Sequence, residues 1–222
     1  MNFKRPLILA SNSPRRQYLL QEVGLNFSKK SPDADESFSP DMAVEEVAGY
    51  LARKKADSIS VEGNEVVITA DTVVILGHLI LNKPENRSEA ISMLETLSGQ
   101  THTVITSFCL KDVNSTQCFS DRTEVTFNAL EKSDIEHYVD HFKPFDKAGA
   151  YGAQDCLPKG TNPCSTLEMK FLERIGRTDL AEKTFTSPEV GTGMRAIKEI
   201  NGSYFNVMGL PIHLVYEQLE NY

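Results

Sequence analysis

The chain has 222 residues, 40% of them hydrophobic and 24% charged, and its formal net charge is −8. These values are typical of a globular protein with one large domain or two small lobes, and the negative charge argues against broad binding to nucleic acid, which needs a basic face. The apolar runs are too short for a membrane span, which needs roughly 20 residues, and too short for a signal peptide. We therefore expect a cytoplasmic protein with no nucleic-acid or membrane partner.

Strand and helix signals alternate through the first hundred residues. Pro6–Ala10 is an apolar run typical of a buried strand. Ser13 and Pro14 then suit the cap and the first position of a helix, which Gly24 ends. The other elements expected in this half are a helix over about 42–58, a strand hairpin that turns at Gly77-His78, and a helix over Asn86–Leu97.

The second half is expected to add antiparallel strands. Alternating polar and apolar residues predict strands over about 101–112 and 118–130. A short helix with Ser133 as its cap should follow. The C-terminal end, from Asn201, should form one more strand and a last helix that starts near Pro211. This order of elements predicts a mixed α/β sheet with flanking helices.

The turn between the first strand and the first helix predicts an anion site. It points backbone N–H groups and the positive end of a helix at whatever lies in front of it. Arg15 and Arg16 stand in the first helical turn, where positive charge is unfavourable. We therefore favour a phosphate site, with two solvent-facing charges as the alternative.

Asp71 interrupts a run that is apolar on both sides. Strand interiors are poor in aspartate, and a buried carboxylate has to be paired, bound to a metal or used in chemistry. We favour a functional role, with a turn or a bulge as the alternative.

Other charged residues could complete such a site. Lys55 and Lys83 are surface charges when taken alone, but beside an anion site they become candidate phosphate contacts. The loop that carries Asp33, Asp35 and Glu36 offers oxygen ligands that suit Mg²⁺, although a solvated acidic loop is the simpler interpretation without that context. Together these groups describe metal-assisted attack of water on a phosphoanhydride, with the strand carboxylate orienting or deprotonating the water.

Several other patterns do not indicate a site. Ser11 and Ser13 lack the G-x-S-x-G turn of a nucleophilic serine. His137 and His141 have the spacing of a metal-binding pair but no evident third ligand, so we interpret them as a surface pair. The cysteines form no CxxC pair and are expected to be free thiols; they are Cys109, Cys118, Cys156 and Cys164.

Seven separated segments carry a family resemblance. They are "ASNSPRR", "LARKKA", "TADTVV", "NKP", "LSGQTHTV", "DKAGAYGAQ" and "NGSYFNVMGLP". In this order and spacing they resemble the Maf family of nucleotide pyrophosphatases, over residues 6–155 and 197–219. Seven motifs together are far more specific than any lone glycine motif.

The resemblance implies a fold, an activity and a set of roles. The fold is a mixed, elongated α/β sheet with flanking helices and a deep cleft, similar to the inosine triphosphate pyrophosphatase architecture, in a single domain over 1–222 with two lobes. The activity is hydrolysis of a nucleoside triphosphate to its monophosphate and pyrophosphate with Mg²⁺ or Mn²⁺, and a homodimer is suggested. The implied roles are catalytic base for Asp71, metal ligands for Glu36 and Asp71, phosphate or catalytic contacts for Arg16, Lys55 and Lys83, and hydroxyl donors to phosphate for Ser11 and Ser13.

Three positions are similar to the family branch that acts on dTTP and UTP. These are Arg15, Thr72 and Gln154, and the branch that prefers 7-methyl-GTP carries other residues there. An amide and a hydroxyl can read the O4 and N3–H edge of a pyrimidine. The resemblance therefore implies a pyrimidine nucleotide as substrate, with Arg15 also near the base.

The chain departs from the family pattern after Gln154, where an insert over about 158–193 precedes the last motif. Its middle has apolar residues at helical spacing, with Ser165 or Thr166 as the cap and Gly176 as the stop. We expect a structured excursion that packs on the rim of the cleft, with a neighbouring subunit as the alternative.

A non-catalytic interaction protein in cell division is the rival interpretation, because the family is associated with septum formation. The charged groups around Asp71 favour an enzyme, since a pure adaptor does not need them.

Overall fold

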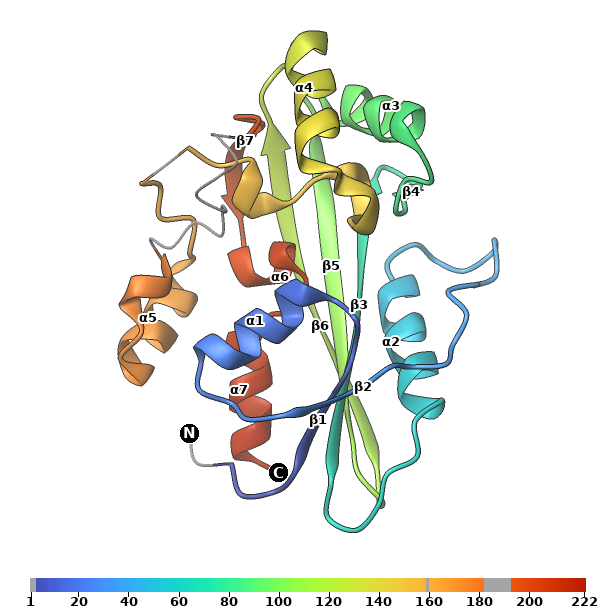
Figure 1. The fold of residues 1–222 in the computed structure, drawn as a ribbon, viewed down its shortest axis with the longest axis vertical. Coiled ribbons are helices and arrows are strands. Elements are labelled where there is room, and N and C mark those ends of the chain that lie inside the picture. Colours follow the sequence, from blue (N-terminus) through green and yellow to red (C-terminus); the bar gives the residue numbers. More distant parts are fainter. Residues whose placement is uncertain (1–2, 159, 182–192) are drawn as a thin grey trace. The chain divides into compact units, whose positions relative to one another are not determined.

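The structure is a computed structural model that describes residues 3–158, 160–181 and 193–222. Within these residues, seven strands form one mixed sheet in the order β2-β1-β3-β5-β6-β7, with β4 paired to β3 (Figure 1). The strands are β1 Leu7–Ala10, β2 Ser28–Lys30, β3 Val66–Leu76, β4 Leu79–Leu81, β5 Thr101–Lys111, β6 Thr116–Phe127 and β7 Ile197–Asn201. The helices are α1 Pro14–Glu22, α2 Val47–Asp57, α3 Arg87–Leu97, α4 Lys132–Phe142, α5 Thr166–Ile175, α6 Tyr204–Met208 and α7 Ile212–Glu220. The predicted mixed α/β fold is therefore confirmed.

The chain divides into two compact units. Unit 1 comprises Met1–Thr72, Ile105–Asp121 and Gly209–Tyr222, and unit 2 comprises Val73–Val104 and Arg122–Met208. Strands β3, β5 and β6 contribute residues to both units. No helix within the described ranges is long and apolar enough to cross a membrane.

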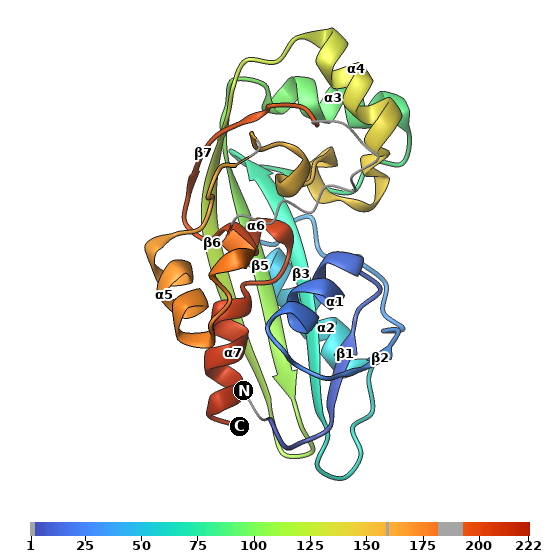
Figure 2. The ribbon, with the colours of Figure 1, turned by 60° about the vertical axis from the view of Figure 1, so that its left-hand side comes forward.

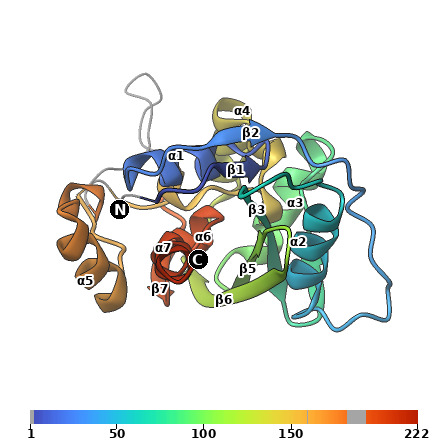
Figure 3. The same ribbon diagram turned by 90° about the horizontal axis from the view of Figure 1, so that it is seen from below.

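Unit 1 is built around the parallel strands β1, β2 and β3. Ile8 of β1 lies opposite Ser28 on one side and Val67 on the other. Ile8 and Val67 are almost fully buried and pack together with Ala10 and Ile59. Helices α1 and α7 lie on one side of these strands and α2 on the other (Figures 1 and 3). Strands β1 and β3 are almost entirely buried, as is usual for parallel strands, whereas β2 is an exposed strand at the edge of the sheet.

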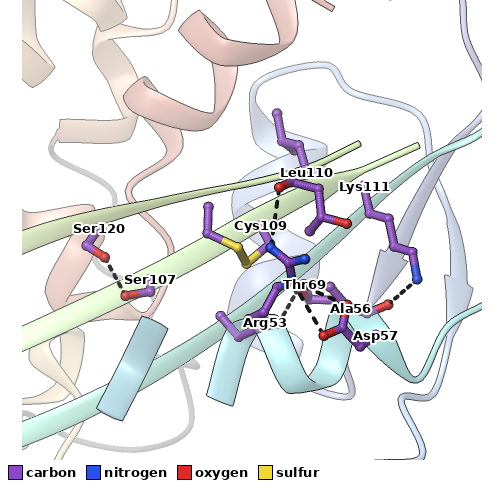
Figure 4. Close-up of a disulfide and its surroundings, with 12 residues drawn as sticks. Arg53, Ala56, Asp57, Thr69, Ser107, Cys109, Leu110, Lys111 and Ser120 are labelled. Carbon is purple, nitrogen blue, oxygen red and sulfur yellow. Dashed lines mark hydrogen bonds and ion pairs between the residues drawn. A yellow bond between two sulfur atoms is a disulfide. The ribbon is translucent and has the colours of Figure 1, made fainter. Parts of the chain in front are cut away.

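A disulfide joins β5 and β6 in unit 1 (Figure 4). Cys109 and Cys118 lie opposite each other with their Cα atoms 4.0 Å apart. The buried Cys109 packs against Ala52 and Ala56 of α2. The expectation of free thiols is therefore wrong for this pair, because cross-strand pairing leaves no signal in the spacing of cysteines along the chain. Cys156 and Cys164 are free.

Antiparallel pairing is found in unit 2. The β3–β4 hairpin places Ile75 opposite Ile80, and β6 pairs with β7 with Val125 opposite Ile200. Helices α3 and α4 lie side by side in this unit (Figures 1 and 2). The hairpin turn at Gly77 has φ 60°, a conformation that glycine adopts without a steric cost.

Several predicted elements differ from the structure. The strand β2 was not expected, because its three residues are exposed and lack an apolar pattern. Helix α2 begins at Val47 rather than near residue 42, and Glu131 rather than Ser133 precedes α4. The C-terminal strand lies before Gly202, and the segment after it forms the helix α6 instead.

The described part of the insert contains the expected helix. Ser165 caps α5 and forms a capping box with Glu168, and Gly176 ends the helix in a left-handed conformation. Phe171 and Leu172 are buried, whereas Leu167 is 69% exposed. Glu168 anchors α5 to Ser203–Phe205 of its own chain, within unit 2. Packing on the cleft rim stays a prediction, and the part of the insert over 182–192 lies outside the described residues.

Candidate functional site

Strand β3 brings two neighbouring polar side chains, Asp71 and Thr72, into unit 1. Successive side chains of a strand leave it on opposite faces. Asp71 accordingly contacts Lys55 of α2, whereas Thr72 contacts Arg16 of α1. The alternative of a turn at Asp71 is wrong, because β3 continues unbroken through this position.

Asp71, Lys55 and Glu36 form a chain of charges. Lys55 Nζ lies 2.5 Å from Asp71 Oδ1 and 2.9 Å from Glu36 Oε1. The side chains of Lys55 and Asp71 are 9% and 10% exposed, whereas Glu36 is 49% exposed. One ammonium thus compensates a buried carboxylate and an accessible one, which explains how Asp71 is tolerated inside an apolar strand.

Arg16 holds together four segments of unit 1. Its Nε donates to the carbonyl of Gly209 at 2.8 Å, and its Nη1 donates to the Ala70 carbonyl at 2.9 Å and to Ser11 Oγ at 3.3 Å. Its Nη2 donates to Thr72 Oγ1 at 3.1 Å. A guanidinium has five N–H groups. The hydrogen bonds formed within the described part of the chain use four of them, so one Nη2 N–H is left for a ligand.

Burial lowers the pKa of the Arg16 guanidinium to about 10, and the nearby Asp71 carboxylate opposes that shift. Arg16 is still protonated at neutral pH. It therefore places a permanent positive charge beside the Asp71–Lys55 pair.

Thr106 of β5 belongs to the same cluster. Its Oγ1 lies 2.9 Å from Thr72 Oγ1, and its side chain is fully buried. Sequence reasoning missed both Thr106 and the carbonyl of Gly209. Thr106 carries no such signal as Asp71 does, because threonine is common in strands that alternate polar and apolar residues. A backbone carbonyl has no signature in the sequence.

The other predicted residues divide between the two units. Ser13 caps α1 by accepting from the Arg16 backbone N–H, and Arg15 lies beside it, partly buried. Lys83 is exposed in unit 2. Gln154, also in unit 2, is buried, and its Oε1 has no hydrogen-bond partner in the described part of the chain. An orphaned buried acceptor of this kind can receive a hydrogen bond from a ligand.

The remaining candidates have simpler explanations. Asp35 pairs with Lys54, and hydrogen bonds from Lys54 and Ser37 hold its pKa well below the ordinary value. His137 and His141 stack on the exposed face of α4 with ring centroids 4.0 Å apart. Over the described ranges, no group of three or more His, Cys, Asp or Glu side chains could hold a metal ion.

This arrangement can perform general-base chemistry on a phosphate ester or anhydride. A carboxylate held by a lysine can accept a proton from water, while nearby cations stabilise negative charge that develops on oxygen. Two carboxylates from Glu36 and Asp71 also fit a divalent cation of the Mg²⁺ type, which binds through one or two carboxylates together with substrate phosphates.

The sequence of this chain matches a known family and several named proteins. The model of the family described as "Maf-like protein" matches residues 6–159. A "dTTP/UTP pyrophosphatase" of Bacteroides thetaiotaomicron is 36% identical over 220 residues, covering 98% of this chain and 96% of that protein. A protein of the same name from Bacteroides fragilis is 37% identical over 217 residues, covering 96% of this chain and 94% of that protein.

Among solved structures, the Ham1 protein of Staphylococcus aureus matches with a TM-score of 0.40 and 12% identity, covering 55% of this chain and 72% of that one. The extent of the family match and the near-complete coverage of the relatives show that this chain belongs to the Maf family.

Proposed function

We propose that this protein hydrolyses nucleoside triphosphates, with dTTP and UTP favoured, to the nucleoside monophosphate and pyrophosphate. The observation that carries the proposal is the buried Asp71–Lys55 pair on β3 and α2, beside the permanent charge of Arg16. The names of the relatives support the reaction and the pyrimidine substrate.

Asp71 is the general base in this proposal. Lys55 occupies its Oδ1, so Oδ2 is the oxygen that we assign to the attacking water. The water loses a proton to Asp71 and attacks the α-phosphorus, and the bond from that phosphorus to the bridging oxygen breaks. The β- and γ-phosphates then leave as one unit, pyrophosphate.

The cations of unit 1 stabilise the charge that develops during this step. Lys55 and the remaining Nη2 N–H of Arg16 face oxyanions, and the hydroxyls of Ser11 and Ser13 donate to phosphate oxygen atoms. Lys83 is assigned to the phosphates as well. Arg15, Thr72 and Gln154 are assigned to the base, where the orphaned Gln154 Oε1 can accept from N3–H of a uracil or thymine.

We also propose a divalent cation, Mg²⁺ or Mn²⁺, as cofactor. Glu36 and Asp71 would hold it, because their oxygen atoms suit a hard cation and Glu36 is accessible. When bound, the cation supplies charge neutralisation at the phosphate oxygens.

Product analysis tests the proposal. Purified protein with UTP or dTTP and Mg²⁺ should release pyrophosphate and no orthophosphate, and UDP should not be converted to UMP and orthophosphate. Release of orthophosphate from UTP would contradict attack at the α-phosphorus.

A further inference from the structure

We propose that Thr106 is a positioning residue that determines specificity, because its hydrogen bond restricts what the Thr72 hydroxyl can offer to the base. Thr72 then presents a single hydrogen-bonding polarity to the base. This inference rests on the proposed function, since it assumes that Thr72 faces the base of a nucleotide. Thr106 itself is fully buried on β5 and does not need to touch the substrate.

Arg16 limits the hydrogen bonds that remain open to Thr72. A guanidinium only donates hydrogen bonds, so its contact at 3.1 Å occupies one lone pair of Thr72 Oγ1. Arg16 cannot turn away freely, because its other bonds hold it to Gly209, Ala70 and Ser11. Thr72 therefore keeps one O–H and one lone pair for its two remaining interactions.

Thr106 forms a hydrogen bond with Thr72, with its Oγ1 2.9 Å from Thr72 Oγ1. If Thr106 donates to Thr72, both lone pairs of Thr72 are used and its O–H remains for the ligand. If Thr72 donates to Thr106, a lone pair remains instead. In either direction the bond to Thr106 takes up one of the two remaining capacities of Thr72, so that only the other is left for the ligand. Without Thr106 the hydroxyl can rotate and offer both.

A Thr72 hydroxyl that can only donate, or only accept, a hydrogen bond distinguishes uracil and thymine from cytosine. A Thr72 that only donates matches O4 but not the amino group of cytosine, and a Thr72 that only accepts matches N3–H but not the bare N3 of cytosine. A freely rotating hydroxyl would adapt to both bases. Sites that hydrogen-bond a substrate discriminate because the wrong partner leaves a polar group unpaired.

The test compares Thr106→Val with Thr106→Ser. Valine keeps the shape but removes the hydroxyl, whereas serine retains it. We expect the ratio of kcat/KM for UTP to kcat/KM for CTP to fall roughly tenfold in Thr106→Val, the size of one neutral hydrogen bond, and to be restored in Thr106→Ser. Thr69→Val is the matched control, because Thr69 is also buried but donates to the Ala52 carbonyl, and it should leave the ratio unchanged.

A double-variant cycle separates specificity from a merely structural effect. In a Thr72→Val background, Thr106→Val should not change the ratio further, since the hydroxyl that it orients is gone. Equal losses of kcat/KM for UTP and CTP in Thr106→Val would overturn the inference, and so would a wild-type enzyme that shows no preference for UTP over CTP. A wild-type protein that releases no pyrophosphate from either nucleotide would refute the proposed function itself.

Discussion

Arg16 in unit 1 and Glu168 in unit 2 are both charged groups held by the chain's own atoms, yet they are held differently. Glu168 is fully buried and accepts five hydrogen bonds, from the N–H and hydroxyl of Ser165, the hydroxyl of Ser203, and the N–H groups of Tyr204 and Phe205. These bonds occupy both of its oxygen atoms.

The cluster around Arg16 is left incomplete by comparison. Arg16 keeps one N–H for a ligand. The neighbouring Lys55 forms ion pairs with the buried Asp71 and the accessible Glu36. A buried charge whose hydrogen-bonding capacity is filled by its own chain stabilises the fold, whereas a charge with bonding capacity left over can act on a substrate. Changes in the two clusters should therefore affect different measurements.

The largest effect is expected for Asp71→Asn. Asparagine keeps the shape of the side chain but cannot act as the base, so kcat should fall by about 10²–10⁴-fold. The melting temperature should change little, because Lys55 keeps Glu36 as a partner. Steady-state release of pyrophosphate measures the loss, and a variant that retains more than about a tenth of the activity would show that Asp71 is not the base.

Glu168→Gln should show the opposite pattern. The amide nitrogen of glutamine would face hydrogen-bond donors that the carboxylate now accepts, so the free energy of unfolding should fall by about 2–4 kcal/mol. Thermal or denaturant unfolding measures this change. At a temperature where the variant is folded, kcat should stay within about threefold of the wild type, because Glu168 is assigned no role in the chemistry.

Glu173→Gln provides the control, since Glu173 is on the same helix but exposed. It should change stability by less than about 0.5 kcal/mol. A Glu168 variant that is as stable as the control but has lost activity would contradict the claim that Glu168 stabilises the fold and has no role in the chemistry.

The sequence predicted most elements because their signals are local. The proline after Ser13 and the glycine at 176 mark helix ends through backbone chemistry, and the structure confirms both. The segment from Tyr204 to Met208 was wrongly predicted as a strand. The first N–H groups of its helix donate to the carboxylate of Glu168, which is distant in the sequence. The disulfide was missed for the same reason, since it depends on which strands pair.

For the candidate site, residue type and family motifs predicted the charged groups, and the structure brings Asp71, Lys55 and Glu36 together. The sequence did not reveal which groups the Arg16 side chain binds within the chain. Its bonds to the carbonyls of Ala70 and Gly209 depend on tertiary packing, and a backbone acceptor is the same at every position. The roles assigned to Lys83 and Gln154 stay predictions.

His102 in unit 2 is a further buried ionisable group, and its charge in the unfolded chain changes with pH. Burial lowers its pKa to about 4 from an ordinary value of 6.5. Below pH 6.5 this histidine is protonated in the unfolded chain, but in the folded chain it stays neutral until about pH 4. The free energy of unfolding should therefore fall as the pH drops through this window, by up to about 3 kcal/mol. Unfolding free energies of the wild type and His102→Gln at several pH values measure the difference.

The variant should lose less stability than the wild type over this window. His78→Gln is the control, because His78 is exposed, and its pH dependence should follow the wild type. Identical slopes for the wild type and His102→Gln would contradict the burial of a neutral imidazole.

The smallest effect is expected for the histidine pair on α4. His137→Ala with His141→Ala should leave kcat and its dependence on Mg²⁺ within about twofold of the wild type, since both side chains are exposed and surface substitutions are usually near neutral. Titration of activity with Mg²⁺ makes the comparison. A lost or shifted metal dependence would place a metal site on α4 instead of in unit 1.

The measurement that tests the account most directly is hydrolysis of UTP in ¹⁸O-labelled water, followed by mass spectrometry of the products. If Asp71 directs water to the α-phosphorus, the label appears in UMP and the pyrophosphate is unlabelled. Label in pyrophosphate, or in orthophosphate released with UDP, would place the attack on another phosphorus and contradict the role assigned to Asp71.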